Sequence, residues 1–158
     1  MVRLSLKEAK ALGFLPGIAK PKKPKKVYVS KAKLDVRNVD GGIVLVVPEN
    51  MPSLNEWMRW HWAKKKRYLD RLTKNFTDLA MVLGWPIFQR ARVEVIHYFR
   101  TSRRRDSGDN YAPKFILDAL RYAGVLAEDN SEVLKVPEPI FRVDKECYRT
   151  EIWIYDNK

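Results

Sequence analysis

The stretch between residues 103 and 129 combines acidic and basic side chains in a pattern suited to a metal ion beside a phosphate group. Three consecutive arginines open it, and five acids follow within 24 residues: Arg103, Arg104, Arg105, Asp106, Asp109, Asp118, Glu128 and Asp129. Carboxylate oxygens without His or Cys nearby suit Mg²⁺ or Mn²⁺ better than Zn²⁺ or copper. Arginine suits phosphate. The stretch therefore predicts metal-assisted chemistry on a phosphodiester.

Each acid also has an ordinary structural interpretation. Asp106 and Asp109 precede an expected helix, where a single Asp is most often a cap. Asp118 would pair with Lys114 or Arg121, which is worth about 0.3 kcal/mol at a surface. Taken together, however, the acids are expected to converge at one end of a sheet, and carboxylates brought together repel unless a cation joins them.

Composition limits the classes of partner. The chain has 158 residues, a formal net charge of +12 and an apolar fraction of 46%, which predict a single globular domain that binds polyanions. No apolar run approaches the roughly 20 residues of a membrane span, and no signal-peptide core follows the first residues, so we expect a cytoplasmic protein. One Cys and two His exclude a disulfide framework and make a zinc centre implausible.

The N-terminal quarter differs from the rest of the chain. Residues 1–15 read as a short helix, and residues 16–26 as an extended linker of alternating Lys and Pro, either a solvated tail or an arm that grasps DNA. We therefore divide the chain into a basic extension, residues 1–40, and a domain, residues 41–158.

The domain is expected to alternate strands and helices. Buried or alternating apolar patterns predict strands at 43–47, 92–100 and 148–155, with an irregular, proline-broken strand at 133–141. Three- and four-residue apolar spacings predict a long helix from about Glu56 to Leu83, ended by Gly84, and a shorter one from about Tyr111 to Ala123. The predicted fold is a mixed α/β (α+β) sheet with one long and one short helix.

The outer surface of the long helix is strongly basic. Between positions 64 and 74 only Asp70 is acidic, which predicts that this surface faces a phosphate backbone; its cations are Lys64, Lys65, Lys66, Arg67, Arg71 and Lys74. Trp57, Trp60 and Trp62 would serve as stacking platforms for bases, but burial of Trp57 and Trp60 in the core or a dimer interface is the favoured interpretation. His97 is expected to be a packed strand residue.

These motifs resemble the RusA family of Holliday junction resolvases. The likeness covers roughly residues 43–155 and rests on Arg-Arg-Arg-Asp106, Asp109-Asn110, Lys114, Asp118-Ala119-Leu120, Gly124 and Glu128-Asp129, with the Pro52-Ser53-x-Asn55 turn. It implies a RusA-like homodimer that resolves four-way DNA junctions by paired symmetric nicks. It also implies Mg²⁺, with Mn²⁺ as substitute, bound by Asp109, Asp118 and Asp129 with a contribution from Asp106. A lysine at the Lys114 position would be needed for cleavage.

Two alternatives stay open. A non-enzymatic DNA- or RNA-binding protein of phage replication or repair would bind without Mg²⁺ and lose affinity steeply with salt. An accessory protein that docks on replication or repair proteins through residues 1–40 would show a partner and no nuclease activity.

Overall fold

The computed structural model describes residues 26–84, 87–103, 111 and 113–158. The predicted helix at 1–15 lies outside these residues, as does the predicted linker except for its last residue. Arg104, Arg105, Asp106 and Asp109 also lie outside them.

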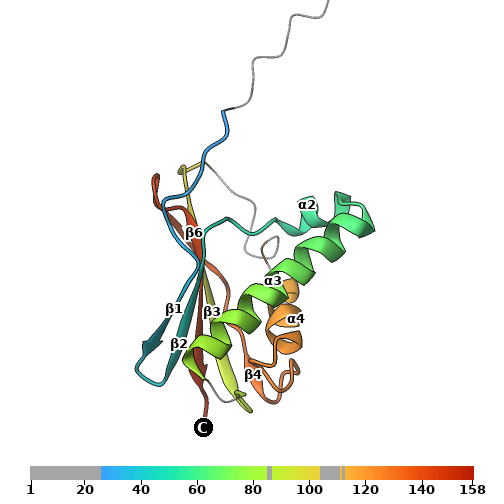
Figure 1. Cartoon of the computed structure of the whole chain (residues 1–158), viewed down its shortest axis with the longest axis vertical. Coiled ribbons are helices and arrows are strands. Elements are labelled where there is room, and N and C mark those ends of the chain that lie inside the picture. Colours follow the sequence, from blue (N-terminus) through green and yellow to red (C-terminus); the bar gives the residue numbers. More distant parts are fainter. Residues whose placement is uncertain (1–25, 85–86, 104–110, 112) are drawn as a thin grey trace, which may run out of the picture.

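A mixed β-sheet forms one layer of the described fold (Figure 1). Its strands follow the order β1-β2-β6-β3-β4, with β5 also paired to β3. The four longest strands pair antiparallel, whereas β4 and β5 run parallel to β3. The bounds are β1 Asp35–Val39, β2 Gly42–Val47, β3 Ala91–Phe99, β4 Leu134–Lys135, β5 Ile140–Val143 and β6 Arg149–Asp156.

Three helices lie on one side of this sheet (Figure 1): α2 Leu54–Arg59, α3 Trp62–Leu83 and α4 Lys114–Tyr122. Helix α3 buries Tyr68, Leu72, Phe76 and Leu79, whose spacings of four, four and three keep them on one stripe. They share a core with the inward positions of the sheet, such as Leu45 on β2. The predicted mixed α/β layer with a long helix is therefore confirmed. No helix of the described residues is long and apolar enough to cross a membrane.

The sequence prediction of one helix from Glu56 to Leu83 is wrong at its start, because the chain forms two helices there. Trp60 and His61 have extended backbones, with ψ of 142° and 145°. Ser53 caps α2 by accepting from the Glu56 amide at 3.2 Å, and the His61 imidazole accepts from the Ala63 amide at 3.3 Å to cap α3. The break lets the Trp60 ring pack back on the Tyr68 ring, with centroids 5.4 Å apart.

Strand β1 was not expected, because its sequence, DVRNV, has only two apolar residues. It pairs with β2 through a two-residue turn, Asp40-Gly41, in which Gly41 has a φ of 75°. An Asp-Gly pair is a strong signal for such a hairpin, since the turn requires a positive φ. Part of the predicted extension, residues 35–39, thus belongs to the sheet.

The other predicted elements are close to those observed. Strand 43–47 corresponds to β2, strand 92–100 to β3 and strand 148–155 to β6, while the proline-broken stretch gives β4 and β5. The short helix begins at Lys114 rather than Tyr111 and ends before Gly124, whose φ is 73°. Pro113 explains the later start, because it fits the position before a helix but not its interior.

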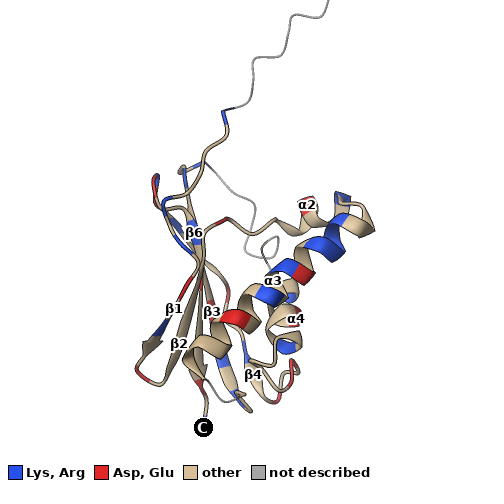
Figure 2. Ribbon diagram, viewed as in Figure 1, with Lys and Arg blue, Asp and Glu red and all other residues tan. Residues whose placement is uncertain are grey.

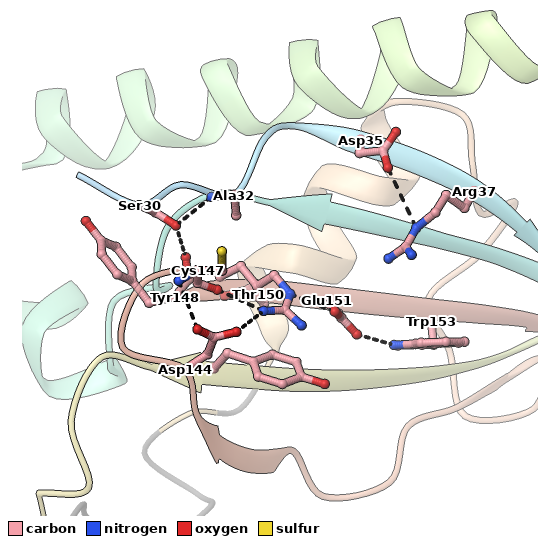
Figure 3. A network of polar contacts seen from close by, with 12 residues as sticks. Ser30, Ala32, Asp35, Arg37, Asp144, Cys147, Tyr148, Thr150, Glu151 and Trp153 are labelled. Atoms are coloured by element: carbon pink, nitrogen blue, oxygen red, sulfur yellow. Dashed lines mark hydrogen bonds and ion pairs between the residues drawn. The ribbon is translucent and has the colours of Figure 1, made fainter.

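The segment before β1 is tied to the turn between β5 and β6 (Figure 3). The Ser30 hydroxyl donates to the Tyr148 carbonyl at 2.5 Å, and the Lys31 amide donates to the Glu146 carbonyl at 2.9 Å. Deeper in this network, the Arg149 guanidinium binds Asp144 at 3.0 Å and the buried Glu151 at 2.7 Å. These contacts hold one end of the sheet in a defined shape.

Candidate nucleic-acid interface

A stripe of cations runs along the outer side of α3 (Figure 2). Lys64, Arg67, Arg71 and Lys74 follow one another at spacings of three, four and three, so they share one helix face. Arg67 and Arg71 each directly precede a buried residue, Tyr68 and Leu72, so the basic face lies beside the buried stripe and not on it. Burial of the apolar stripe in the core therefore fixes the cations on the outside.

Ion pairs divide this stripe into a neutralised half and a free half. Toward the C-terminus, Arg71 binds Glu49 at 2.9 Å and Lys74 binds Asp78 at 2.5 Å. Lys66, beside the stripe, binds Asp70 at 2.8 Å. Within the described part of the chain, no acid pairs with Lys64, Lys65 or Arg67. The uncompensated positive charge therefore lies at the N-terminal end of α3, a narrower surface than the sequence predicted.

Aromatic rings support that end of the helix. Trp57 stacks on Phe115 with centroids 5.0 Å apart and lies 5.5 Å from Trp60. The Lys64 ammonium lies 3.8 Å from the centre of the Trp60 ring, a cation–π contact that fixes the charge on the surface. Both tryptophans are partly buried against the core, as the favoured interpretation expected. Trp62 differs, since 70% of it is exposed beside the free cations.

Helix α4 and the turn that follows it carry the described part of the predicted metal site. Asp118 is half-buried, one turn after the exposed Lys114. Arg121, one turn further on, lies 3.7 Å from Asp129, so the two aspartates approach the same side of α4. Among the described residues, Asp118 forms no ion pair with Lys114 or Arg121, so the alternative in which it pairs with one of them is not supported.

Some of the residues predicted to bind the metal belong to the part of the chain that the structure describes, and others lie outside it. Asp106 and Asp109, with Arg104 and Arg105, lie outside the described residues. Among the residues that the structure describes, no three His, Cys, Asp or Glu side chains come together as a metal site. Asp118 on α4 and Asp129 in the turn after it each offer hard oxygen donors, with the Arg121 guanidinium 3.7 Å from Asp129. A metal at this end of α4 stays a prediction.

His97 is a packed strand residue, as expected. Its side chain is 1% exposed and is surrounded by the rings of Phe99, Tyr111 and Phe141 at 5.4–5.8 Å. Burial lowers the pKa of the imidazole from 6.5 to about 4, because desolvation penalises its charged form. The imidazole is therefore neutral near pH 7.

The hydrogen bonds around His97 identify its tautomer. Nδ1 lies 3.4 Å from the Thr150 hydroxyl, which donates its own proton to the Glu49 carbonyl at 3.0 Å. Since that hydroxyl proton is already used, Nδ1 must carry the ring proton and donate. Nε2 then keeps a lone pair, and it has no hydrogen-bond partner among the described residues.

A cavity at the end of β3 was not predicted from the sequence. A cavity of about 350 Å³ is lined by Asn50, Glu56, Arg100, Arg103 and Tyr111, among others. These residues come from the segment after β2, from α2, from the end of β3 and from the residues before α4. The predicted DNA-binding residue Arg103 is exposed and lies on the wall of this cavity. Only the topology brings these segments together.

Comparison with known proteins gives weak likenesses. No family model matches the chain, and no curated protein matches it. A solved structure of the periplasmic domain of Helicobacter pylori MotB, residues 78–256, has 14% identity and a TM-score of 0.40, and the likeness covers 78% of this chain and 82% of that one. A second structure of that domain, residues 97–256, has 17% identity and a TM-score of 0.37, covering 78% and 87%.

These findings correct the function expected from the RusA resemblance. The neighbours named above are MotB periplasmic domains, and no matching family model supports a resolvase. On these comparisons the prediction of a Holliday junction resolvase, a nuclease of DNA recombination and repair, is wrong and is set aside. At TM-scores of 0.37 to 0.40 the likeness carries no property of MotB to this chain either. The separate expectation of a Mg²⁺-dependent enzyme stays a prediction.

Proposed function

We propose that this chain is a DNA-binding protein that contacts the phosphate backbone through the N-terminal end of α3. The observation that carries the proposal is the free half of the cationic stripe, Lys64, Lys65 and Arg67, which has no acidic partner among the described residues. A phosphate backbone is the partner that such a surface fits, because each contact releases a condensed counterion. The formal net charge of +12 adds long-range attraction to any polyanion.

The neighbouring aromatic surface adds a second kind of contact. Trp62 is 70% exposed and Met58 72% exposed, both beside the free cations in sequence. Aromatic side chains among cations hold unpaired bases by stacking, in addition to the backbone contacts. This arrangement favours DNA with single-stranded or branched segments. The preference for branched DNA expected from the sequence is kept here as a proposal.

The test is a salt titration of binding to a fluorescently labelled duplex, with Lys64→Gln and Arg67→Gln combined. Loss of two phosphate contacts should lower the slope of log affinity against log salt by about 1.8. Lys74→Gln is the matched control on the same helix, because Lys74 is already paired with Asp78 at 2.5 Å. An unchanged slope in the double variant would refute the proposed surface. A labelled branched DNA of the same sequence tests the preference for branches.

We also propose that Asp118 and Asp129 supply oxygen ligands to Mg²⁺, with Mn²⁺ as a substitute. Carboxylates are the donors that these hard ions prefer. The Arg121 guanidinium lies 3.7 Å from Asp129, so a metal has to compete with it for that carboxylate. Such a metal would activate water or neutralise charge next to a bound phosphate. Mn²⁺ binding followed by electron paramagnetic resonance should weaken in Asp118→Asn. The exposed Asp40→Asn is the control, and equal Mn²⁺ binding by both variants would refute the assignment.

The finer expectations of a RusA-like arrangement and a homodimer are proposals as well. The edge strand β5 supports association, because Ile140 is 41% and Val143 55% exposed on it. Exposed apolar edge strands invite pairing with another chain. Sedimentation equilibrium of the full chain and of Val143→Lys tests the dimer: a dimer that dissociates in the variant supports it, and a monomeric parent refutes it.

A further inference from the structure

The residues that line the cavity at the end of β3 include two chemically different groups. The first is cationic, Arg100 and Arg103, and neither has an acidic partner among the described residues. The Arg100 guanidinium is held in place by stacking 3.4 Å from the centre of the Tyr28 ring. Two cations at the mouth of a small cavity suit an anionic group, and arginine forms bidentate bonds with phosphate.

The second group of lining residues presents hydrogen-bond acceptors. The Asn50 carboxamide donates from Nδ2 to the Tyr98 carbonyl at 2.8 Å, which fixes its orientation and leaves Oδ1 as the atom able to accept. Glu56, in the first turn of α2, adds a carboxylate. A ligand that satisfies both groups carries an anion and N–H donors.

We infer that this cavity binds a single unstacked nucleotide of a DNA strand. Its phosphate contacts Arg100 and Arg103, and its base directs N–H groups to Asn50 and Glu56 beside the Tyr111 ring. The volume of about 350 Å³ falls within the range of small-molecule sites, about 300–1,000 Å³. The inference deepens the proposed DNA binding and rests on it, since it names the feature of the DNA that the protein reads.

The two acceptors also select among bases. Cytosine, adenine and guanine each carry an exocyclic amino group that donates hydrogen bonds, whereas thymine presents carbonyl oxygens at its exocyclic positions. Thymine offers one hydrogen-bond donor on its pairing edge, N3–H, between two carbonyl oxygens, so it cannot satisfy both acceptors and sets a carbonyl oxygen against one of them. The cavity should therefore prefer amino-bearing bases to thymine.

The experiment compares binding of the full chain to three labelled ten-nucleotide strands of equal charge: oligo-dC, oligo-dT and a fully abasic strand. The two pyrimidine strands are close in size and differ in the group at position 4, in the proton on N3 and in the 5-methyl group of thymine. Fluorescence anisotropy should give oligo-dC an affinity at least about fivefold above oligo-dT, with the abasic strand weakest. Glu56→Met should bring the ratio of dC to dT affinity close to one.

Two matched controls separate the cavity from net charge. Glu132→Met removes the same charge from an exposed site elsewhere and should leave the dC to dT ratio unchanged. Arg103→Gln should lower the salt slope for single strands by about 0.7, while Arg90→Gln, also exposed, should not. An unchanged ratio in Glu56→Met, with an unchanged slope in Arg103→Gln, would overturn the cavity assignment.

The outcomes distinguish this inference from the function on which it rests. Tight, salt-dependent binding with equal affinities for dC, dT and abasic strands would overturn the nucleotide site and leave DNA binding in place. Failure of the parent chain to bind any of these strands or a duplex would overturn the proposed function and the inference together.

Discussion

The buried imidazole of His97 should make stability depend on pH in a predictable window. Its pKa is about 4 in the folded chain and near 6.5 when unfolded, since burial disfavours the charged ring. Between these values the unfolded chain binds a proton that the folded chain does not. The stability that the buried neutral imidazole of His97 contributes is therefore fully present above pH 6.5 and is lost as the pH falls toward 4.

The size of the effect follows from the shift. A pKa that falls from 6.5 to about 4 corresponds to a loss of about 3 kcal/mol when the pH drops across that window. The packed neighbours Phe99, Tyr111 and Phe141 carry no charge in this range, so they do not offset the loss.

The perturbation is His97→Phe, which keeps an aromatic ring in the cluster and removes the titrating group. Thr150 still donates to the Glu49 carbonyl in this variant, so its hydroxyl is not left without a partner. At pH 7 the variant should lie within about 1.5 kcal/mol of the parent, as expected for a near-isosteric core change. Between pH 6.5 and 4.5 it should lose less stability than the parent.

The assay is urea unfolding followed by circular dichroism at pH 7.0, 6.0, 5.0 and 4.5. Titration of carboxylates affects both proteins and cancels in their difference. His61→Asn is the control, because His61 is exposed and Asn preserves the helix cap. Parallel pH profiles for parent and His97→Phe would refute the reasoning and would mean that the folded chain also protonates Nε2 in this range, with water or an acceptor in reach of it.

Three further predictions concern the fold and the surface. Gly42→Ala should lower the free energy of unfolding by about 2 kcal/mol or more in urea titrations, because a Cβ there would lie 1.9 Å from the Ile154 carbonyl oxygen. Gly84→Ala meets no atom within 4 Å and should cost only the strain of its φ of 61°, about 1 kcal/mol. Glu151→Gln should cost about 1–3 kcal/mol by the same measurement, since Glu151 is buried and accepts from Arg149 and Trp153. Trp62→Ala should weaken oligo-dC binding about fivefold and leave thermal stability unchanged, as its ring is 70% exposed; a large drop in melting temperature would show that the ring packs.

The sequence predicted those elements whose apolar pattern matches their burial. Strand β2 is an apolar run rich in β-branched residues that the fold buries throughout, and the buried residues of α3 follow one stripe. The break at Trp60 and His61 was not predictable from helix breakers, since neither Gly nor Pro is present there. It depends on tertiary packing of Trp60 against Tyr68 and on an imidazole used as a cap.

The candidate site was predictable one residue at a time but not as a surface. Sequence identifies the basic positions of α3, but it does not show that Arg71 is neutralised by Glu49, 22 positions earlier. The cavity is even harder to predict from sequence, because nothing near Asn50 or Arg103 in the chain indicates that the ends of β2 and β3 bring both residues to the same cavity. Charge pairing and concavity are tertiary properties.

The break between α2 and α3 connects the two proposed contacts with DNA. Helix α2 carries Glu56 to the cavity wall, while Trp57 and Trp60 support Lys65 and Lys64 at the start of α3. A continuous helix would extend by about 1.5 Å per residue along the α3 axis and carry Glu56 past the end of β3. The break therefore places an acceptor, Glu56, on the lining of the cavity that also carries Arg100 and Arg103, which have no acidic partner among the described residues. A strand whose backbone follows the cations would bring one of its nucleotides to that cavity.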